Sequence, residues 1–433
     1  MTSTFHGINT SLRGLLAQQR ALDVTSHNIA NADRAGYTRQ EAVLAGAPAV
    51  HLPLGSLQDG AGAFLGSGVE VQAYRRIRDD FLDLQWRAQN MSLGYDEATA
   101  QRLGQAEDVL GEGTPGSLGA LLDRFWSSWQ DLANNPESGS AKAAVLGAAQ
   151  TLAGRFNALD ADLSSLTANI AAEYNGLVGG AGPVQAAATE IARLNASITQ
   201  AVQAGQQPND LLDRRDELID NLSKLGQVSV TDLGNGTLRV NFGDAAQPLV
   251  DDTTVTWPQA LTAATGGRLG ALLTASQTTI PGYRAALDAM ASQVATAVNG
   301  AHPTAVFSGA TAASLAVVAT PGSITAGSSG AAGDNAVARA IGALRGGAID
   351  QAYATFLTQV GSDVAAAQGG QATSEAVLGA VSDRRAAVAG VSMDEEMTNM
   401  VRFQRGYQAA ARAMSTMDDM LDTLINRTGR VGL

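Results

Sequence analysis

The amino-acid sequence predicts a mainly α protein, a long helical bundle or coiled coil formed by the N-terminal and C-terminal halves, with a small inserted β module. Three observations support this prediction. Apolar residues recur at alternating steps of three and four near both ends of the chain, which is the spacing of coiled-coil helices. Residues 79–205 have helical spacing and are rich in Ala, Leu, Gln and Asp. The clearest β pattern lies within residues 226–262.

The N-terminal helix is predicted over residues 5–29, and at 1.5 Å per residue it would be about 38 Å long. Its heptad positions form one narrow stripe, which suits a coiled coil, although packing on the core of its own domain explains the stripe equally well. The stripe consists of Phe5, Ile8, Leu12, Leu15, Gln19, Leu22, Ser26 and Ile29.

Residues 31–68 have a different character. Seven Gly and two Pro residues stop helices there, so we expect a long loop with short extended pieces. Val69 and Val71 alternate with polar residues and predict a strand. We interpret the charged run that follows as a solvated helix start with local charge pairing: Arg75, Arg76, Arg78, Asp79 and Asp80.

A helical body is predicted over residues 76–225 and 263–389, where Gly and Pro turns separate several long helices. Three large aromatic side chains gather within it, and we expect them to anchor the packing of helices rather than to bind a ligand. They are Phe125, Trp126 and Trp129.

A small β module is predicted at residues 226–262, because apolar residues alternate on both sides of a Gly234-Asn235-Gly236 turn. Farther along, residues 304–333 contain no charged residue and are mostly Ala, Gly, Ser and Thr. Such a composition leaves little to bury, so we expect a lightly structured, low-complexity connection there.

The C-terminal helix begins with a capping-box pattern, Ser392 with Glu395, and acidic residues occupy its first turn, where the helix dipole favours them. Its apolar positions follow a heptad with one short step. They are Met393, Met397, Met400, Phe403, Tyr407, Ala410, Met414, Met417, Leu421 and Leu424.

The two ends of the chain, residues 1–75 and 390–433, therefore carry heptad-patterned helices without an obvious core of their own. The simplest arrangement is that these helices pack on each other, or on equivalent helices of other copies. The chain would then run out and back, with its ends forming an axial coiled-coil core and its middle forming an outer body.

Composition and motifs narrow the possible functions. A net charge of −13 argues against nucleic acid or an anionic membrane as a partner, because both attract clustered basic charge. The absence of Cys excludes a disulfide framework, a thiolate metal site and a cysteine nucleophile. No apolar stretch is long enough to cross a membrane, and residues 1–16 lack the pattern of a cleaved signal peptide, so we expect neither feature.

No motif argues for catalysis. Residues 111–116 match G-x-G-x-x-G, but a predicted helix rather than a strand precedes them and Pro115 interrupts them. The four His residues are scattered, and no H-E-x-x-H, G-x-S-x-G or Walker pattern occurs. We therefore expect no enzyme activity, no metal and no cofactor.

Four segments resemble one group of flagellar proteins. N-I-A-N at residues 28–31, followed by A-G-Y-T-R-Q at 35–40, resembles the N-terminal signature of flagellar rod, hook and hook-associated proteins. Residues 66–82, the P-N-D-L-L-D-R-R-D-E-L segment at 208–218 and residues 390–407 are similar to segments of the hook-associated protein 1 family. Together these segments span the chain, and the one at 208–218 favours this family over hook protein.

The resemblance implies a structural adapter at the junction of the flagellar hook and filament, assembled as a short ring of identical subunits. The implied partners are other copies of the chain, hook protein, the second hook–filament junction protein, and an export chaperone that binds the C-terminal helix at about 392–430. It also implies export through the flagellar type III apparatus to an extracellular position. Longer members of the family carry a larger outer domain where this chain has only residues 304–333. The alternatives are another axial protein, such as hook protein or the second junction protein, or a secreted enzyme on a helical scaffold.

We expect the terminal helices to form the assembly interface and to become ordered only when copies pack together, as the resemblance implies. Each Leu, Ile, Met or Phe buried there would contribute roughly 1.5–3 kcal/mol. The loop around Tyr37 could contact adjacent subunits or pack on its own domain, and the charged residues at 213–216 could fix helix contacts or form weak surface pairs. The candidate interface residues are Phe5, Ile8, Leu12, Leu15, Leu22, Asn28, Ile29, Asn31, Tyr37, Met393, Met397, Met400, Phe403, Tyr407, Met414, Met417, Leu421 and Leu424.

Overall fold

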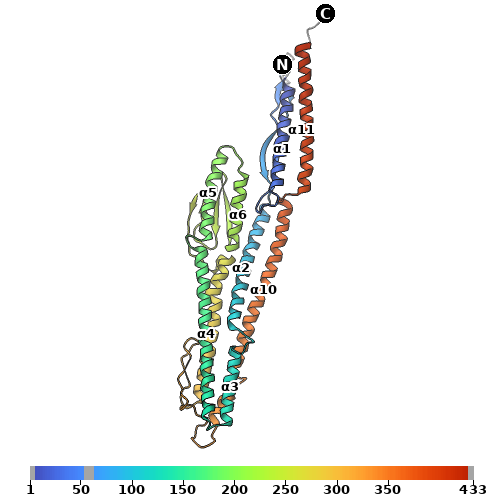
Figure 1. Cartoon of the computed structure of the whole chain (residues 1–433). Coiled ribbons are helices and arrows are strands. Elements are labelled where there is room, and N and C mark those ends of the chain that lie inside the picture. The colour runs from blue at the N-terminus through green and yellow to red at the C-terminus, as the bar shows by residue number, and fades with distance from the viewer. Residues whose placement is uncertain (1–4, 53–62, 428–433) are drawn as a thin grey trace.

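The computed structural model describes residues 5–52 and 63–427. The molecule is elongated, and a pair of helices from the two ends of the chain projects beyond a longer helical body (Figure 1). Long helices dominate, and the sheets within the described residues have two to four strands. The predicted mainly α fold is therefore confirmed.

The projecting part, called the terminal unit below, consists of α1, β1–β4 and α11. Helix α1 (His6–Ala30) packs along α11 (Met393–Asp422), as the paired heptad patterns predict (Figure 1). Strand β1 pairs antiparallel with β4, and β2 with β3, so the strand predicted at Val69 and Val71 is present. The strands are β1 (Gln40–Gly46), β2 (Val50–Leu52), β3 (Ala63–Leu65) and β4 (Val69–Arg76).

Two long helices connect the terminal unit to the body. Helix α2 (Asp80–Leu110) follows β4 directly, and the Asp79 carboxylate caps it by accepting hydrogen bonds from the backbone N–H groups of Phe81 and Leu82. Helix α10 (Ala348–Ala389) packs beside α2 and leads back into α11 (Figure 1). The chain therefore leaves the terminal unit on one helix and returns on its neighbour.

The rest of the body is built mainly from six more helices. The longest, α4, has 40 residues and is therefore about 60 Å long. The six are α3 (Leu118–Asn134), α4 (Gly139–Val178), α5 (Pro183–Gln203), α6 (Asn209–Leu225), α8 (Ile280–Ala301) and the short α7 (Gly267–Thr274). A one-turn 3₁₀ helix (Ala263–Thr265) precedes α7, a π-helical turn (Ala275–Thr279) joins α7 to α8, and α9 (Ala336–Gly342) precedes α10.

Aromatic side chains of α3 lie at the centre of the main core. Phe125, Trp126 and Trp129 are fully buried, and Phe125 packs edge-on against Phe307 with ring centroids 5.7 Å apart. Side chains of α4 and α8 surround them. The predicted role of this aromatic group in helix packing is confirmed.

The β module is a four-stranded antiparallel sheet in the order β5-β6-β7-β8. Asn235 and its two Gly neighbours have positive φ, so the turn needs residues that tolerate the left-handed region. The sheet packs on α5 and α6 to form a second core. Its strands are β5 (Val228–Gly234), β6 (Thr237–Phe242), β7 (Val250–Asp251) and β8 (Thr254–Val255).

The segment 304–333 corrects an expectation. It holds only the two-residue strands β9 (Phe307–Ser308) and β10 (Ala316–Val317), but it is not poor in buried side chains. The Asn157 side chain of α4 donates hydrogen bonds to two of its carbonyls. The segment therefore packs on the helical bundle as part of the main core. Six of its apolar residues belong to that core: Val306, Phe307, Ala312, Leu315, Ile324 and Ala326.

Candidate functional site

Small side chains bring α1 and α11 close together. A Cβ atom added at Gly7 would lie 2.5 Å from Met417 Sδ, and one at Gly406 would lie 2.8 Å from the Gln18 side chain. The Ser11 hydroxyl points at the same Met417 sulfur, 3.8 Å away. Larger residues at these positions would push the helices apart.

The face that α1 buries differs from the predicted apolar stripe. Phe5 and Leu12 are exposed, and the remaining apolar members of the stripe are half-buried. The residues that α1 does bury are small or polar, because close approach to α11 and to the β1–β4 ribbon leaves room only for such side chains. They are Ser11, Ala17, Ala21, Thr25 and Asn28.

The predicted stripe of α11 is divided along the helix. Its middle members are half-buried on the side of α1, and its end members Met393, Met397 and Leu424 are exposed. The half-buried members are Met400, Phe403, Tyr407, Met414, Met417 and Leu421. Whether these faces contact other subunits stays a prediction, because the structure contains one chain.

Asn28 is the central polar residue at the base of the terminal unit, where it is 1% exposed. Its Nδ2 atom donates to the Gln40 carbonyl at 2.9 Å and to Glu396 Oε2 at 3.2 Å. Its Oδ1 atom accepts from the Gln40 N–H at 3.0 Å and from the Tyr37 hydroxyl at 2.7 Å. One amide therefore joins α1, the loop after it, β1 and α11.

The neighbouring residues Asn31 and Tyr37 differ in their surroundings. Asn31 is half-buried, and its side chain makes local hydrogen bonds, to the carbonyl and ring of His27. Tyr37 is half-buried, and burial, with Asp210 and Asp213 nearby, raises the pKa of its hydroxyl above the usual value. The Tyr37 loop thus packs within its own chain, and a contact with a neighbour is a further prediction.

Arg39 connects the same base to the start of α11. Its guanidinium pairs with Glu395 at 2.6 Å and with the buried Glu396 at 2.7 Å. Burial opposes its charge, but the hydrogen bonds to the two carboxylates raise the pKa of Arg39 overall. Ser392 Oγ caps α11 as predicted, whereas the Glu395 carboxylate pairs with Arg39 instead of completing the capping box.

The charged run at 75–80 is a solvated helix start only in part: Asp79 and Asp80 are exposed at the start of α2, whereas Arg76 and Arg78 are largely buried, which corrects the sequence interpretation for these two arginines. Arg76 bonds to Asp213 at 2.9 Å and to Asp216 at 2.8 Å, both on α6 and more than 130 positions away. Arg78 bonds to Asp83 and Asp216, and its burial lowers its pKa. Only Arg75 makes the expected surface pair, with Glu41 of β1.

Two more arginines complete this buried network. Arg87 of α2 bonds to Asp220 at 2.6 Å, and Arg385 of α10 bonds to Asp83 at 2.7 Å and to Asp220 at 2.8 Å. The ion network thus holds four arginines and four aspartates, so its formal charges cancel. Its members are Arg76, Arg78, Arg87, Arg385, Asp83, Asp213, Asp216 and Asp220.

Arg215 and Arg214 differ although they are neighbours. Arg215 is buried and donates to the Asn195 side chain at 2.9 Å and to the Gly236 carbonyl at 2.6 Å, which holds the β module on α5 and α6. Burial, with Arg76 nearby, lowers the pKa of Arg215 to about 10. Arg214 makes only a surface pair with Glu217. Of the 213–216 segment, Arg215 thus fixes contacts within the body, as predicted, whereas Asp213 and Asp216 join the body to Arg76 of the terminal unit and Arg214 makes the weak surface pair.

Sequence reasoning missed Arg87, Arg385 and Asp220. The aspartates of α6 carried a usable signal, because steps of three and four from Asp213 to Asp216 and Asp220 place them on one helix face. Such an acidic stripe needs basic partners if it is buried. Nothing in the local sequence around Arg385 points to it, since its partners lie on α2 and α6.

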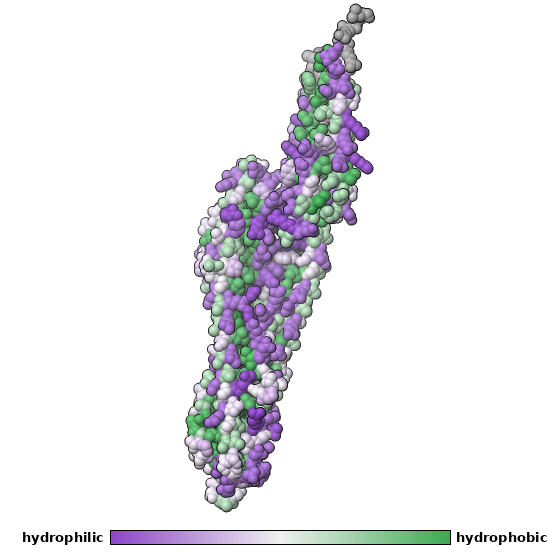
Figure 2. Space-filling view, viewed as in Figure 1, coloured by the Kyte–Doolittle hydropathy of each residue, from purple (hydrophilic) through white to green (hydrophobic). Residues whose placement is uncertain are grey.

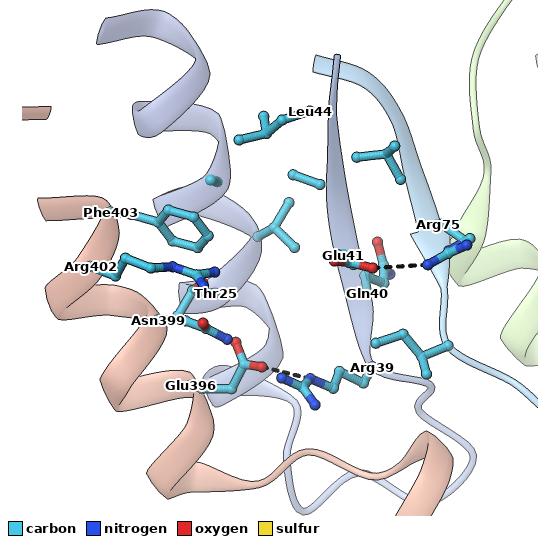
Figure 3. Close-up of a pocket in the computed structure, with 15 residues that line it drawn as sticks. Thr25, Arg39, Gln40, Glu41, Leu44, Arg75, Glu396, Asn399, Arg402 and Phe403 are labelled. Atoms are coloured by element: carbon cyan, nitrogen blue, oxygen red, sulfur yellow. Dashed lines mark hydrogen bonds and ion pairs between the residues drawn. The ribbon is translucent and has the colours of Figure 1, made fainter. Parts of the chain in front are cut away.

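A cleft of about 560 Å³ opens beside these contacts, between α1, β1 and α11 (Figure 3). Figure 3 shows Arg402 and Phe403 reaching from α11 toward α1, with the Arg39–Glu396 pair at the lower edge. Within the described residues there is no group of His, Cys, Asp and Glu suited to hold a metal ion. The described helices also include none with the length and apolarity needed to span a membrane.

The segments that resemble flagellar proteins therefore meet in space. Residues 28–40, 75–83, 208–218 and 390–397 are joined by the Asn28 hydrogen bonds, the Arg39 pairs and the ion network. Their role is to fix the terminal unit on the body.

Comparisons with known proteins agree with this placement. A family model described as "Flagellar hook-associated protein FlgK helical domain" matches residues 103–263. Models of the "Flagella basal body rod protein" and of the "Flagellar basal body rod FlgEFG protein C-terminal" match residues 8–38 and 387–427. Flagellar hook-associated protein 1 of Bacillus subtilis is 31% identical, and the match covers 99% of both chains. The chain belongs to the flagellar hook-associated protein 1 family.

This membership makes the chain a component of the bacterial flagellum, associated with its axial proteins. Hook-associated protein 1 of Salmonella typhimurium is 32% identical over 68% of this chain and 56% of its own length. Hook-associated protein 1 of Escherichia coli is 30% identical over 55% of this chain and 42% of its own length. The chain thus spans about half the length of these two relatives. The structure of the flagellar hook junction protein FlgK from Burkholderia pseudomallei matches 52% of this chain and 46% of its own, with 25% identity and a TM-score of 0.46.

Proposed function

We propose that this chain is the structural adapter between the flagellar hook and filament and that it assembles into a short ring of identical subunits. Hook protein would lie on one side of the ring, and the second hook–filament junction protein on the other. An export chaperone would bind α11 before the flagellar type III apparatus delivers the chain to the cell exterior. Membership of the flagellar hook-associated protein 1 family supports a structural role for the chain.

The outward apolar face of the terminal unit carries this proposal. Leu12 and Leu16 of α1 are 40% and 44% exposed, and Met397 and Val401 of α11 are 51% and 43% exposed. Figure 2 shows apolar groups along this narrow projecting part, among polar ones. Within the terminal unit, α11 and the β1–β4 ribbon cover only part of α1, so copies packed around an axis would cover the apolar side chains that one chain leaves exposed.

The test is complementation of a strain that lacks its own junction protein, using Leu12→Asp with Leu16→Asp. Both side chains point away from α11, so the variant should fold and be exported, yet it should leave bare hooks and shed filament protein into the medium. The matched control is Leu233→Asp, because Leu233 is similarly exposed, at 39%, but lies in the β module. Normal filaments on the double variant would refute assembly through this face.

A further inference from the structure

The cleft between α1, β1 and α11 contains one guanidinium, that of Arg402, with no carboxylate partner among residues 5–52 and 63–427. Arg39 and Arg75 at its edge pair with carboxylates, but in the part of the chain that the structure describes no carboxylate pairs with Arg402. The Arg402 guanidinium instead stacks over the Phe403 ring, 4.8 Å from its centroid. Stacking orients the guanidinium and leaves its N–H donors available for an acidic group.

The opposite charge lies farther along the same helix. Asp418 and Asp419 of α11 are exposed, and neither carboxylate pairs with a basic side chain within the described residues. They adjoin the half-buried Met417 and Leu421, so this end of α11 combines acidic and apolar side chains. The cleft offers the matching set, because Val24, Leu44 and Phe403 line it together with Arg402 (Figure 3).

One copy cannot bring these groups together, because both lie on one continuous helix. The 16 residues from Arg402 to Asp418 correspond to about 24 Å at 1.5 Å per residue. Two parallel copies in register would place Arg402 beside Arg402 and Asp418 beside Asp418, which is repulsive. If one copy is shifted along the axis by about 24 Å, Arg402 of one copy lies beside Asp418 of the other, and these opposite charges attract.

We propose that this cleft receives the distal end of α11 from a second copy of the chain, with Asp418 and Asp419 pairing with Arg402. This inference rests on the proposed function, since it specifies one contact between the assembled copies. It sets the relative height of the two copies, because Arg402 would face the Arg402 of the neighbour if the copies were in register.

Charge reversal tests the pair, with assembly of the purified full-length protein on isolated hooks as the readout. Arg402→Asp alone, and Asp418→Arg with Asp419→Arg, should each lower the assembled fraction roughly tenfold, since like charges would then meet. The variant with all three changes should recover most of the loss. No loss in the first two variants, or no recovery in the third, would overturn the inference.

Crosslinking tests the geometry directly, because the chain has no Cys of its own. In assembled protein, Asn399→Cys with Asp418→Cys should give a ladder of disulfide-linked multimers, since Asn399 lines the cleft. Asn399→Cys with Ala413→Cys is the control, because the exposed Ala413 lies on the face of α11 turned away from both Asp418 and Asp419 and should give no ladder. Crosslinks to hook protein only, or equal ladders from both variants, would contradict the inference.

The two proposals fail in different ways. If the unchanged chain does not add to hooks at all, the proposed function is wrong. If the unchanged chain assembles normally but charge reversal and crosslinking give the contrary results above, only the contact at Arg402 is wrong.

Discussion

Replacing Asn28 with Ala should detach the terminal unit from its base without disturbing the body. The substitution removes the four hydrogen bonds to Gln40, Tyr37 and Glu396, whose donor–acceptor distances are 2.7–3.2 Å. Each such bond contributes about 0.5–1.5 kcal/mol net, and water entering the gap would recover part of the loss. We therefore expect the local stability of the terminal unit to fall by about 2–4 kcal/mol, which is roughly 30-fold to 700-fold in the opening equilibrium.

Hydrogen exchange measures this local opening. Amides of α1 and of the first half of α11 should exchange faster by the factor above, whereas those of α3 and α4 should be unchanged. Asn31→Ala is the matched control, because Asn31 bonds only to His27 one turn away. If both variants exchanged alike, or if the body opened equally in Asn28→Ala, Asn28 could not be the connecting residue described above.

Three more changes probe the body, each measured by denaturant unfolding. Gly94→Ala should lower the free energy of unfolding by more than about 2 kcal/mol, because a Cβ there would lie 2.1 Å from a backbone carbonyl of α6. Gly104→Ala is on the same helix, but its Cβ would meet nothing within 4 Å, so this variant should raise the free energy of unfolding by about 0.5–1 kcal/mol. Arg385→Met should lower the free energy of unfolding by about 3 kcal/mol, because Asp83 and Asp220, both largely buried, would each lose one of their two arginine partners. Arg345→Met breaks an exposed pair and should cost under about 1 kcal/mol, and equal costs would contradict burial of the network. Burial lowers the pKa of His302, so below pH 6.5 the unfolded chain takes up a proton more readily than the folded chain does. The free energy of unfolding should therefore fall from pH 7 to pH 5 more steeply in the unchanged protein than in His302→Asn. Parallel pH profiles of the two proteins would contradict this.

The pairing of the two chain ends could be predicted from sequence, but the buried face of α1 could not. Two heptad registers overlap in this helix: Leu12 and Leu15 belong to the apolar one, and Ser11 and Ala21 belong to the buried one. Hydrophobicity selects the leucines, whereas close helix packing selects the small side chains. Both faces of α1 therefore have a pattern suited to helix packing, and the sequence does not tell which of them is buried within the chain.

The long-range ion pairs of Arg76 and Arg78 could not be predicted from sequence either. The run from Arg75 to Asp80 places Asp79 and Asp80 directly beside three arginines, so its sequence fits a solvated helix start with local charge pairing. The actual partners of Arg76 and Arg78 include Asp216 on α6, and nothing local to either segment specifies that contact. The burial of segment 304–333 could not be predicted either. Six of its apolar residues pack into the main core together with side chains of α4, and the sequence of the segment does not indicate this contact.

The contact between Ser11 and Met417 joins residues 406 positions apart in the sequence. Forming it means closing a loop that contains almost all of the chain, which is slow and entropically costly unless the intervening helices are already compact. We therefore expect α1 to pair with α11 late in folding. A truncated product without its last helix would expose the Ser11 face of α1 with nothing to cover it, and could be distinguished from the finished protein on that basis.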